Sequence, residues 1–334
     1  MKASDTVHLI YGSDDNYVFP TMISAASAAV GIRGSLDLVV HLFDLGVSNA
    51  NYTAFEALLR RVNSHVVCVR HVLDKKLFNG FGAWRGSIAT YARMLVPDLL
   101  PELDWAIYVD GDTLWLGDIG ELWDLRDESV AVLASIDPPT PMGVSRPDVE
   151  WYRDHGLVVN DRDYFCAGLI LMNICALREM NMVRQCQEFM AKYPSPRVVD
   201  QTALNYVLQG RAKLLPSEWG VFSAWHGTAD LSKACCVHYV DDLPWRRDKV
   251  NRLLSDVVLL WYYFCDDVLK MDLLQKHVSL AGRVWRRTLF LVLKRNQWML
   301  YSAYVRSRLR NTHGISCATL RDIRARWKSV HGEV

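Results

Sequence analysis

Short apolar runs and helical repeats alternate along most of the chain. Runs rich in β-branched residues are typical of strands, and apolar positions at three- and four-residue steps are typical of amphipathic helices. We expect strands at residues 7–11, 36–43, 65–69, 105–109, 130–136, 165–173 and 234–240. We expect helices at residues 17–30, 51–62, 87–97, 183–192 and 199–208. This alternation predicts an α/β fold in which a mostly parallel, Rossmann-like sheet carries helices on both faces.

The predicted strand at residues 105–109 carries no charge and ends in Asp110 and Asp112, which are separated by Gly111. An uncharged strand suits the interior of a parallel sheet, where ligands bind beyond the carboxyl ends of the strands. Two neighbouring carboxylates repel each other, and a divalent cation such as Mg²⁺ or Mn²⁺ would relieve that repulsion. A turn in which the Asp side chains bond the local backbone explains the same tripeptide equally well.

Further polar residues follow other predicted strands. They are Asp14, Asn16 and Tyr17 after the first strand, Asp137 after the strand at 130–136, Asp200 and Gln201 in the first turn of a helix, and His238 near the end of the last strand. Because the carboxyl ends of parallel strands meet at one edge of a sheet, ligands bind there. We therefore expect these side chains to contribute to one site.

The last part of the chain has a different composition. From residue 248 the pattern is helical only, and residues 281–328 hold twelve Lys or Arg against one acid, Asp322. With a net charge of +1 for the whole chain, this segment carries +11 and the remainder −10. Basic residues that alternate with apolar and aromatic ones predict an amphipathic helix on an anionic membrane surface. The alternative is a helix packed on the α/β domain with a solvated basic face. No recognised nucleic-acid-binding module accompanies the charge, so we do not expect a nucleic-acid partner.

Eight cysteines occur without CxxC pairs or regular spacing, a pattern typical of reduced thiols in a chain of 334 residues. The first thirteen residues lack the apolar core of a signal peptide, and no apolar run reaches the length of a membrane span. We therefore expect a cytoplasmic protein that lies peripherally on the inner face of a membrane.

Seven short segments give these residues a common context. They are Tyr-Gly-Ser-Asp-Asp-Asn-Tyr at 11–17, Thr-Tyr-Ala-Arg at 90–93, Tyr-Val-Asp-Gly-Asp at 108–112, Ala-Ser-Ile-Asp at 134–137, Tyr-Phe-Cys-Ala-Gly at 164–168, Asp-Gln at 200–201, and His-Tyr at 238–239 followed by Pro-Trp at 244–245. In this order they resemble family 8 glycosyltransferases, the retaining group of GT-A fold that includes bacterial lipooligosaccharide galactosyltransferases and glycogenin.

The resemblance implies a GT-A catalytic domain at residues 1–247, followed by a helical, basic region at 248–334. It implies a retaining enzyme that moves a hexose, galactose or glucose, from a UDP-sugar to a glycan. The acceptor would be lipopolysaccharide or another surface polysaccharide, including lipid-linked glycans.

The resemblance also implies roles for single residues. Gly12, Asp14, Asn16 and Tyr17 would hold the uridine, with the ring of Tyr17 stacked on the base. Asp110, Asp112 and His238, with Gly111 between the carboxylates, would bind Mn²⁺ or Mg²⁺ and the diphosphate. The residues that would face the donor sugar or nucleotide and serve catalysis are Arg93, Asp137, Asp200 and Gln201.

Two positions depart from the family pattern. Cys166 stands where the family commonly has an Asn that contacts the donor sugar, and Leu243 stands where a Lys precedes Pro-Trp and meets the β-phosphate. Arg246 or Arg247 could supply the missing charge. These departures leave open a sugar-nucleotide-binding protein of the same fold with little or no turnover. A nucleotidyltransferase fits less well, because the loop at 12–17 is acidic rather than basic.

Overall fold

The computed structural model describes most of the first 273 residues. The described ranges are residues 6–84, 86–137, 147–194, 196, 198–223, 233–240, 243–246 and 256–273. The expected boundary at residues 247 and 248 and the predicted basic amphipathic helix lie outside the described residues.

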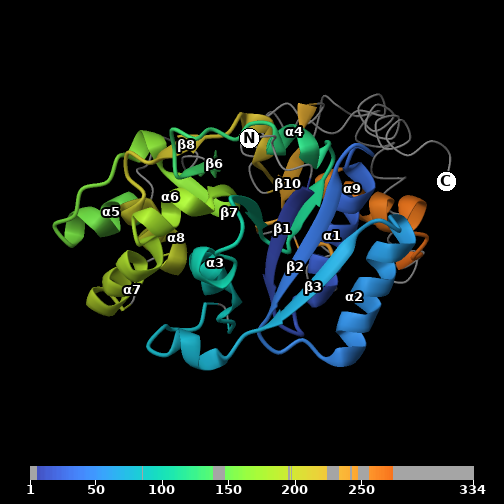
Figure 1. Ribbon diagram of the computed structural model, residues 1–334, viewed down its shortest axis with the longest axis horizontal. Coiled ribbons are helices and arrows are strands. Elements are labelled where there is room, and N and C mark those ends of the chain that lie inside the picture. The colour runs from blue at the N-terminus through green and yellow to red at the C-terminus, as the bar shows by residue number, and fades with distance from the viewer. Residues whose placement is uncertain are drawn as a thin grey trace, which may run out of the picture.

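A seven-stranded sheet forms the centre of the molecule (Figure 1). Its strand order is β3-β2-β1-β4-β7-β6-β8. The bounds are β1 Thr6–Ser13, β2 Asp37–Asp44, β3 Val67–Val72, β4 Trp105–Val109, β6 Val132–Ile136, β7 Phe165–Asn173 and β8 Ala212–Leu214. All neighbours are parallel except β7, which runs antiparallel to β4 and β6. The mostly parallel sheet predicted from the sequence is confirmed.

A second, three-stranded sheet lies beyond the end of β4. It contains β5 Thr113–Trp115, β10 Cys236–His238 and β9 Val221–Phe222, in the order β5-β10-β9. The sequence predicted the strand that ends near His238, but not that this strand leaves the main sheet and pairs antiparallel with β5. Strands as short as β5 and β9 show too little alternation to be read from sequence.

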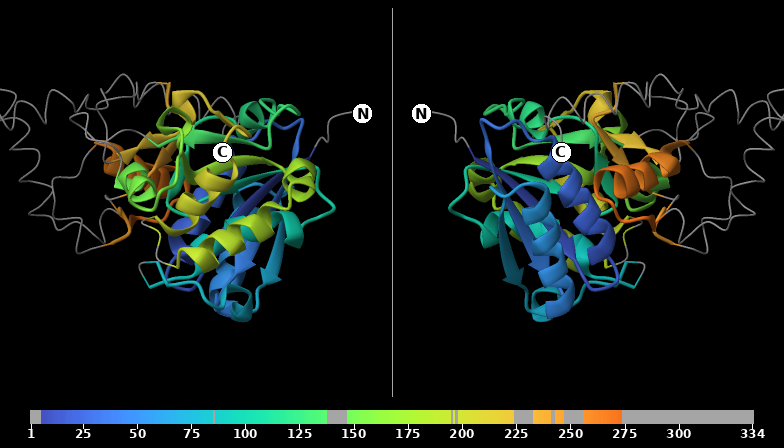
Figure 2. Two further views of the ribbon diagram at one scale, coloured as in Figure 1. Left: turned by 90° about the vertical axis from the view of Figure 1, so that its left-hand side faces the viewer. Right: turned by 90° about the vertical axis from the view of Figure 1, so that its right-hand side faces the viewer.

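Helices cover both faces of the main sheet, as expected (Figure 2). On one face, α1 Val18–Gly31 and α2 Asn49–Val62 share a hydrophobic core with β1 and β2. On the other face, a second core joins the strands to a 3₁₀ helix Ala89–Leu95 and to α3 Val96–Leu99, α6 Ile174–Glu179, α7 Met182–Lys192 and α8 Val199–Val207. The other α-helices of the described residues are α4 Ile119–Trp123, α5 Pro147–Asp154 and α9 Asp256–Tyr263, the last followed by a π-helical turn at Phe264–Val268. Further 3₁₀ helices span Lys75–Phe78, Asp161–Asp163 and Ser217–Trp219.

The helix expected at residues 87–97 differs in kind. It is a 3₁₀ helix that continues into the short α3, with Pro97 at its start. Pro97 has no N–H to donate to the carbonyl of Arg93, so the α-helical hydrogen-bond pattern is interrupted where the 3₁₀ helix meets α3. The tighter helix keeps Arg93 buried, with 4% of its surface exposed.

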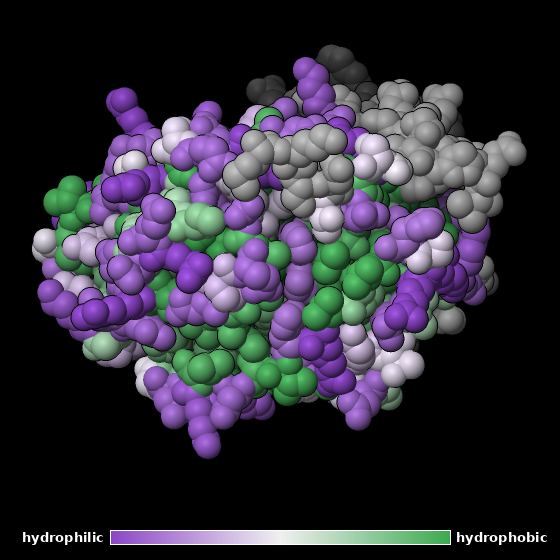
Figure 3. Space-filling view, viewed as in Figure 1, coloured by the Kyte–Doolittle hydropathy of each residue, from purple (hydrophilic) through white to green (hydrophobic). Residues whose placement is uncertain are grey.

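The surface is hydrophilic over much of the face seen in Figure 3, with hydrophobic side chains gathered at the lower centre of the view and to the right of centre. At the β3 edge, Val67 and Val72 are 53% and 74% exposed. Among the described residues, no helix combines the length and apolar character that a membrane span requires.

Candidate active site

The candidate site lies where β4 ends and the chain turns toward β5. Asp110 is the first residue after β4, and its backbone N–H donates to the carbonyl of Gly168 at 2.9 Å. Because β7 is antiparallel to β4, the beginning of β7 reaches the edge at which the parallel strands end. This arrangement brings Gly168 beside Asp110 and Cys166 beside His238, which strand prediction alone does not foresee.

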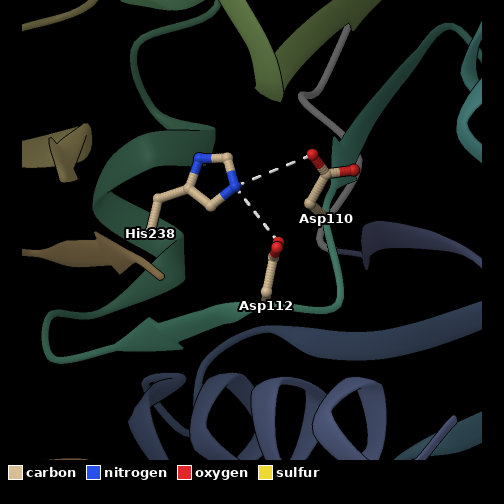
Figure 4. Close-up of side chains that lie close together, drawn as sticks. All are labelled: Asp110, Asp112 and His238. Carbon is tan, nitrogen blue, oxygen red and sulfur yellow. Dashed lines mark ion pairs between the residues drawn. The ribbon is translucent and has the colours of Figure 1, made fainter. Parts of the chain in front are cut away.

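Asp110, Asp112 and His238 form a three-residue cluster (Figure 4). His238 is the last residue of β10, and its Nε2 lies 3.1 Å from Oδ1 of Asp112 and 3.8 Å from Oδ2 of Asp110. One ligand atom from each residue lies within 4.8 Å of the others. The pairing of β10 with β5 fixes this approach, because it places His238 opposite Thr113, directly after Asp112.

The donor set of this cluster fits a divalent metal ion. In Figure 4 the Nε2 of His238 faces the space between the two carboxylates. Oδ1 of Asp112 is buried and accepts no hydrogen bond from the described residues, although Nε2 is only 3.1 Å away. Two carboxylates and one imidazole form a mixed oxygen and nitrogen donor set that Mn²⁺ accepts, with Mg²⁺ the harder alternative.

Two glycines leave room for the cluster. A Cβ atom on Gly111 would lie 2.1 Å from Oγ1 of Thr21, and one on Gly168 would lie 2.4 Å from Cε1 of His238. Any side chain at either position would therefore displace an element of the site. The sequence analysis assigned no role in the site to Gly168. The only signal for it was its position in the family-like segment at residues 164–168.

Arg93 is a buried cation that pairs with two carboxylates of the site. Its guanidinium contacts Oδ1 of Asp110 at 2.6 Å and Oδ2 of Asp200 at 2.9 Å, and it also donates to the carbonyl of Ala167. Thr90 Oγ1 donates to the other carboxylate oxygen of Asp200 at 2.6 Å. Asp110 and Asp200, which lie far apart in the sequence, thus share one buried cation.

The ionisable groups of the cluster shift one another's pKa values. Burial raises the pKa of Asp110 to about 6, although Arg93 opposes the shift. Burial also acts to raise the pKa of Asp112, but the positive charge of His238 outweighs it, so that pKa falls. Burial acts to lower the pKa of His238, yet Asp112 raises it well above its usual value. The metal-free cluster therefore keeps a proton on His238, where a metal ion would compete with it.

The predicted uridine loop is tied to the same cluster. The hydroxyl of Tyr17 donates to Oδ2 of Asp112 at 2.9 Å, and its ring makes an edge contact with Trp245 at 5.7 Å between centroids. Asp14 accepts from the backbone N–H of Asn16 at 3.0 Å and from Oγ of Ser87 at 2.7 Å. Asn16 itself is exposed.

Gly12 precedes this loop at the end of β1. A Cβ atom there would lie 2.9 Å from the carbonyl oxygen of Ala89 and 3.0 Å from the hydroxyl of Tyr108. The close approach holds β1 against the 3₁₀ helix that carries Arg93.

The remaining predicted residues lie around β7. Gln201 Oε1 accepts the backbone N–H of Ala167 at 3.0 Å, so Gln201 and Arg93 contact the same residue. Asp137 follows β6, and its N–H donates to the carbonyl of Tyr164 at 3.3 Å. Burial raises the pKa of the Cys166 thiol, and the negative charge of Asp137 adds to that shift.

Cys166 and Leu243, which depart from the family pattern, both lie in the part of the chain that the structure describes. Cys166 is 5% exposed, and its Sγ lies 3.9 Å from Nδ1 of His238. Leu243 is 7% exposed, and the backbone N–H of the exposed Arg246 donates to its carbonyl at 3.0 Å. Arg247 lies outside the described residues.

Comparison with known proteins gives a consistent result. A family model described as glycosyl transferase family 8 matches residues 8–249. A Haemophilus influenzae protein is 26% identical over 215 residues, which cover 64% of this chain and 62% of that protein. Glycosyltransferase GlyB of Streptococcus pneumoniae is 22% identical over 294 residues, which cover 81% of this chain and 66% of that protein. The chain therefore spans less than two thirds of the length of the Haemophilus relative.

Solved structures show the same fold. Galactosyltransferase LgtC superposes with a TM-score of 0.64 at 22% identity, over 78% of this chain and 96% of that chain. The bifunctional glycosyltransferase WbbM superposes with a TM-score of 0.63 at 20% identity, over 82% of this chain and 52% of that chain. The expected GT-A architecture is confirmed.

Proposed function

The chain belongs to glycosyl transferase family 8, and from this premise we propose that it is a retaining, metal-dependent hexosyltransferase that uses a UDP-sugar donor. The observation that carries the proposal is the cluster of Asp110, Asp112 and His238, tied through Tyr17 to the loop after β1. A metal-ligand set and a nucleotide loop that share one hydrogen bond suit a donor that presents diphosphate and base together.

Asp110, Asp112 and His238 would hold the ion, and a bound Mn²⁺ or Mg²⁺ would supply positive charge to the diphosphate as it departs. The uridine would lie against Gly12, Asp14, Asn16 and Tyr17. In this role Asp14 is preorganised, because Asn16 and Ser87 already hold both of its carboxylate oxygens.

The residues near the donor sugar support same-face attack rather than a covalent intermediate. Both carboxylate oxygens of Asp200 are engaged, one by Arg93 and one by Thr90, which makes Asp200 a weak nucleophile. Gln201 is an amide, and the backbone N–H of Ala167 holds its oxygen. We therefore propose that the acceptor hydroxyl attacks on the face that the diphosphate leaves, and that a diphosphate oxygen takes its proton. Asp137 would orient the donor, and Arg93 would orient the carboxylates of Asp110 and Asp200.

The donor sugar is proposed to be galactose or glucose, and the acceptor a surface glycan such as lipopolysaccharide. Galactose is supported by the likeness in fold to LgtC, which is a galactosyltransferase. We further propose that residues 1–247 form the catalytic domain. Residues 248–334 would bind the domain peripherally to an anionic inner membrane face, on the cytoplasmic side.

Hydrolysis of UDP-galactose, UDP-glucose and their N-acetyl forms, with and without Mn²⁺, tests the enzyme. We expect hydrolysis of one hexose donor that depends on Mn²⁺ and is lost on chelation. Retained anomeric configuration in the product, measured by NMR, is expected for same-face attack, and an inverted product would contradict it.

A binding protein without turnover is the second candidate, favoured by Cys166 and Leu243. Calorimetric binding of a UDP-sugar, together with no hydrolysis or transfer at any Mn²⁺ concentration, would support this second reading and overturn the first.

A further inference from the structure

The imidazole of His238 is enclosed by groups from β7 and β9. The backbone at Gly168 lies so close that a Cβ there would meet Cε1 of the ring at 2.4 Å. The ring of Phe222 lies 5.3 Å from the imidazole, centroid to centroid. Sγ of Cys166 lies 3.9 Å from Nδ1. Groups from β7 and β9 therefore hold the ring against translation while Nε2 faces Asp110 and Asp112.

A metal ligand on Nε2 requires the other ring nitrogen to keep its proton. Ligating histidines almost always donate that second N–H to an acceptor, which fixes the tautomer and the orientation of the ring. Within the described residues, Sγ of Cys166 is the only hydrogen-bond partner of Nδ1. The backbone N–H of Gly168 donates to the same sulfur at 3.3 Å, which holds Cys166 in this rotamer.

We propose that Cys166 is the positioning residue of the metal site. Its sulfur accepts the Nδ1 proton of His238, so that the lone pair of Nε2 is available between Asp110 and Asp112. This inference rests on the proposed metal-dependent function. Sulfur is a weak acceptor, so the site gains orientation more than ligand basicity from it. Cys166 therefore acts on the metal through His238, rather than on the donor sugar.

The test measures Mn²⁺ affinity directly, from the free-ion EPR signal of the full chain in the absence of any UDP-sugar. Cys166→Ala removes the acceptor, and we expect Mn²⁺ affinity to fall by about tenfold or more. Cys166→Ser restores an acceptor of similar size, and we expect affinity within about threefold of the wild type. Cys186→Ala is the matched control, because this buried thiol contacts Met182 on α7 and not the cluster. Its affinity is expected to equal that of the wild type.

Each outcome separates the inference from the proposed function. If Asp112→Ala abolishes Mn²⁺ binding while Cys166→Ala binds as the wild type does, the metal site stands and the role of Cys166 is overturned. Equal weakening in Cys166→Ala and Cys166→Ser, or in the Cys186→Ala control, also overturns it, since packing would then explain the loss. If Asp112→Ala binds Mn²⁺ as tightly as the wild type, the proposed metal-dependent function itself fails.

Discussion

Gly168 and Gly111 show how single residues shape the site without contributing any functional group. The position of Gly168 is close to both His238 and Asp110, where a Cβ would lie 3.1 Å from Oδ2 of the aspartate. Gly111 separates the two carboxylates and touches Thr21 on α1. The missing side chains allow β7 and α1 to approach, and the ligand atoms are held within reach of one ion as a result.

The first prediction concerns the ligands themselves. Asp110→Ala or Asp112→Ala is expected to reduce Mn²⁺-dependent turnover by at least about 100-fold, because an ion held by two protein ligands cannot be placed as the reaction requires. Circular dichroism should show an unchanged fold. Activity that survives both substitutions would mean that the two aspartates only form a turn.

The second prediction concerns Gly168. Gly168→Ala introduces a methyl group that overlaps the imidazole of His238, so the ring or β7 must shift. We expect Mn²⁺ affinity to fall by about tenfold or more, since overpacking displaces a metal ligand. Gly156→Ala is the control, because that glycine has open space around it, although its φ of +67° costs some stability. An unchanged affinity in Gly168→Ala would contradict the close approach.

At the scale of elements, three strands converge on one site from two sheets. The turn from β4 to β5 supplies the carboxylates, β7 runs the opposite way and supplies its first residues, and β10 supplies His238 from the small sheet. Elsewhere in the main sheet, β1, β2 and β3 each contribute one imidazole to a row formed by His8, His41 and His71. The ring nitrogens of neighbouring histidines lie 3.0 Å apart in both contacts.

The third prediction concerns this histidine row. Burial lowers the pKa of His41 to about 3, and His8 and His71 add to the shift. In the unfolded chain His41 takes up a proton as pH falls below 6.5, whereas in the folded chain it stays neutral until about pH 3. Its contribution to the free energy of unfolding is therefore fully present above pH 6.5 and is lost as pH falls toward 3. At pH 5 the loss from His41 is about 2 kcal/mol. Urea unfolding at pH 7 and pH 5 measures it.

His41→Gln removes this titration and is expected to flatten the pH dependence of the unfolding free energy between pH 7 and pH 5. His155→Gln, at an exposed histidine on another face, should keep the wild-type slope. An unchanged slope in His41→Gln would show that the row does not govern acid stability. Burial lowers the pKa values of His8 and His71 at the two ends of the row, and the negative charge of Glu102 opposes that shift at both.

At the scale of the whole molecule, an acidic body is joined to a basic terminal segment. Residues 281–328 carry a charge of +11, from twelve basic residues and one acid, against −10 for the remainder. Such a segment is attracted to anionic lipid over the range of the Debye length, so its binding depends on salt.

The fourth prediction concerns that segment. We expect the full chain to sediment with vesicles that contain anionic lipid, and to be released as the salt concentration rises. Deleting residues 281–334 should abolish sedimentation while leaving UDP-sugar hydrolysis within about threefold of the full chain. Vesicle association that the deletion leaves unchanged would contradict the membrane proposal.

The sequence by itself determined the elements and the residue types of the site. Apolar runs located β1, β2, β4 and β7, and the polar residues after the strands named each side chain of the Asp110, Asp112 and His238 cluster. This was readable because burial and strand ends leave local signals in hydrophobic patterning. The sequence also predicted a helix in the segment that carries Arg93, but not its 3₁₀ form.

Only the tertiary structure decided which of these residues meet. The antiparallel direction of β7, the departure of β10 into a second sheet and the contact of Cys166 with His238 all depend on pairing between segments distant in sequence. The sequence of one strand does not predict whether its neighbour is parallel or antiparallel, because side chains alternate between the two faces in the same way in both arrangements. The residue types of the site could therefore be predicted from the sequence, whereas the contacts between them depend on how the strands pair in the fold.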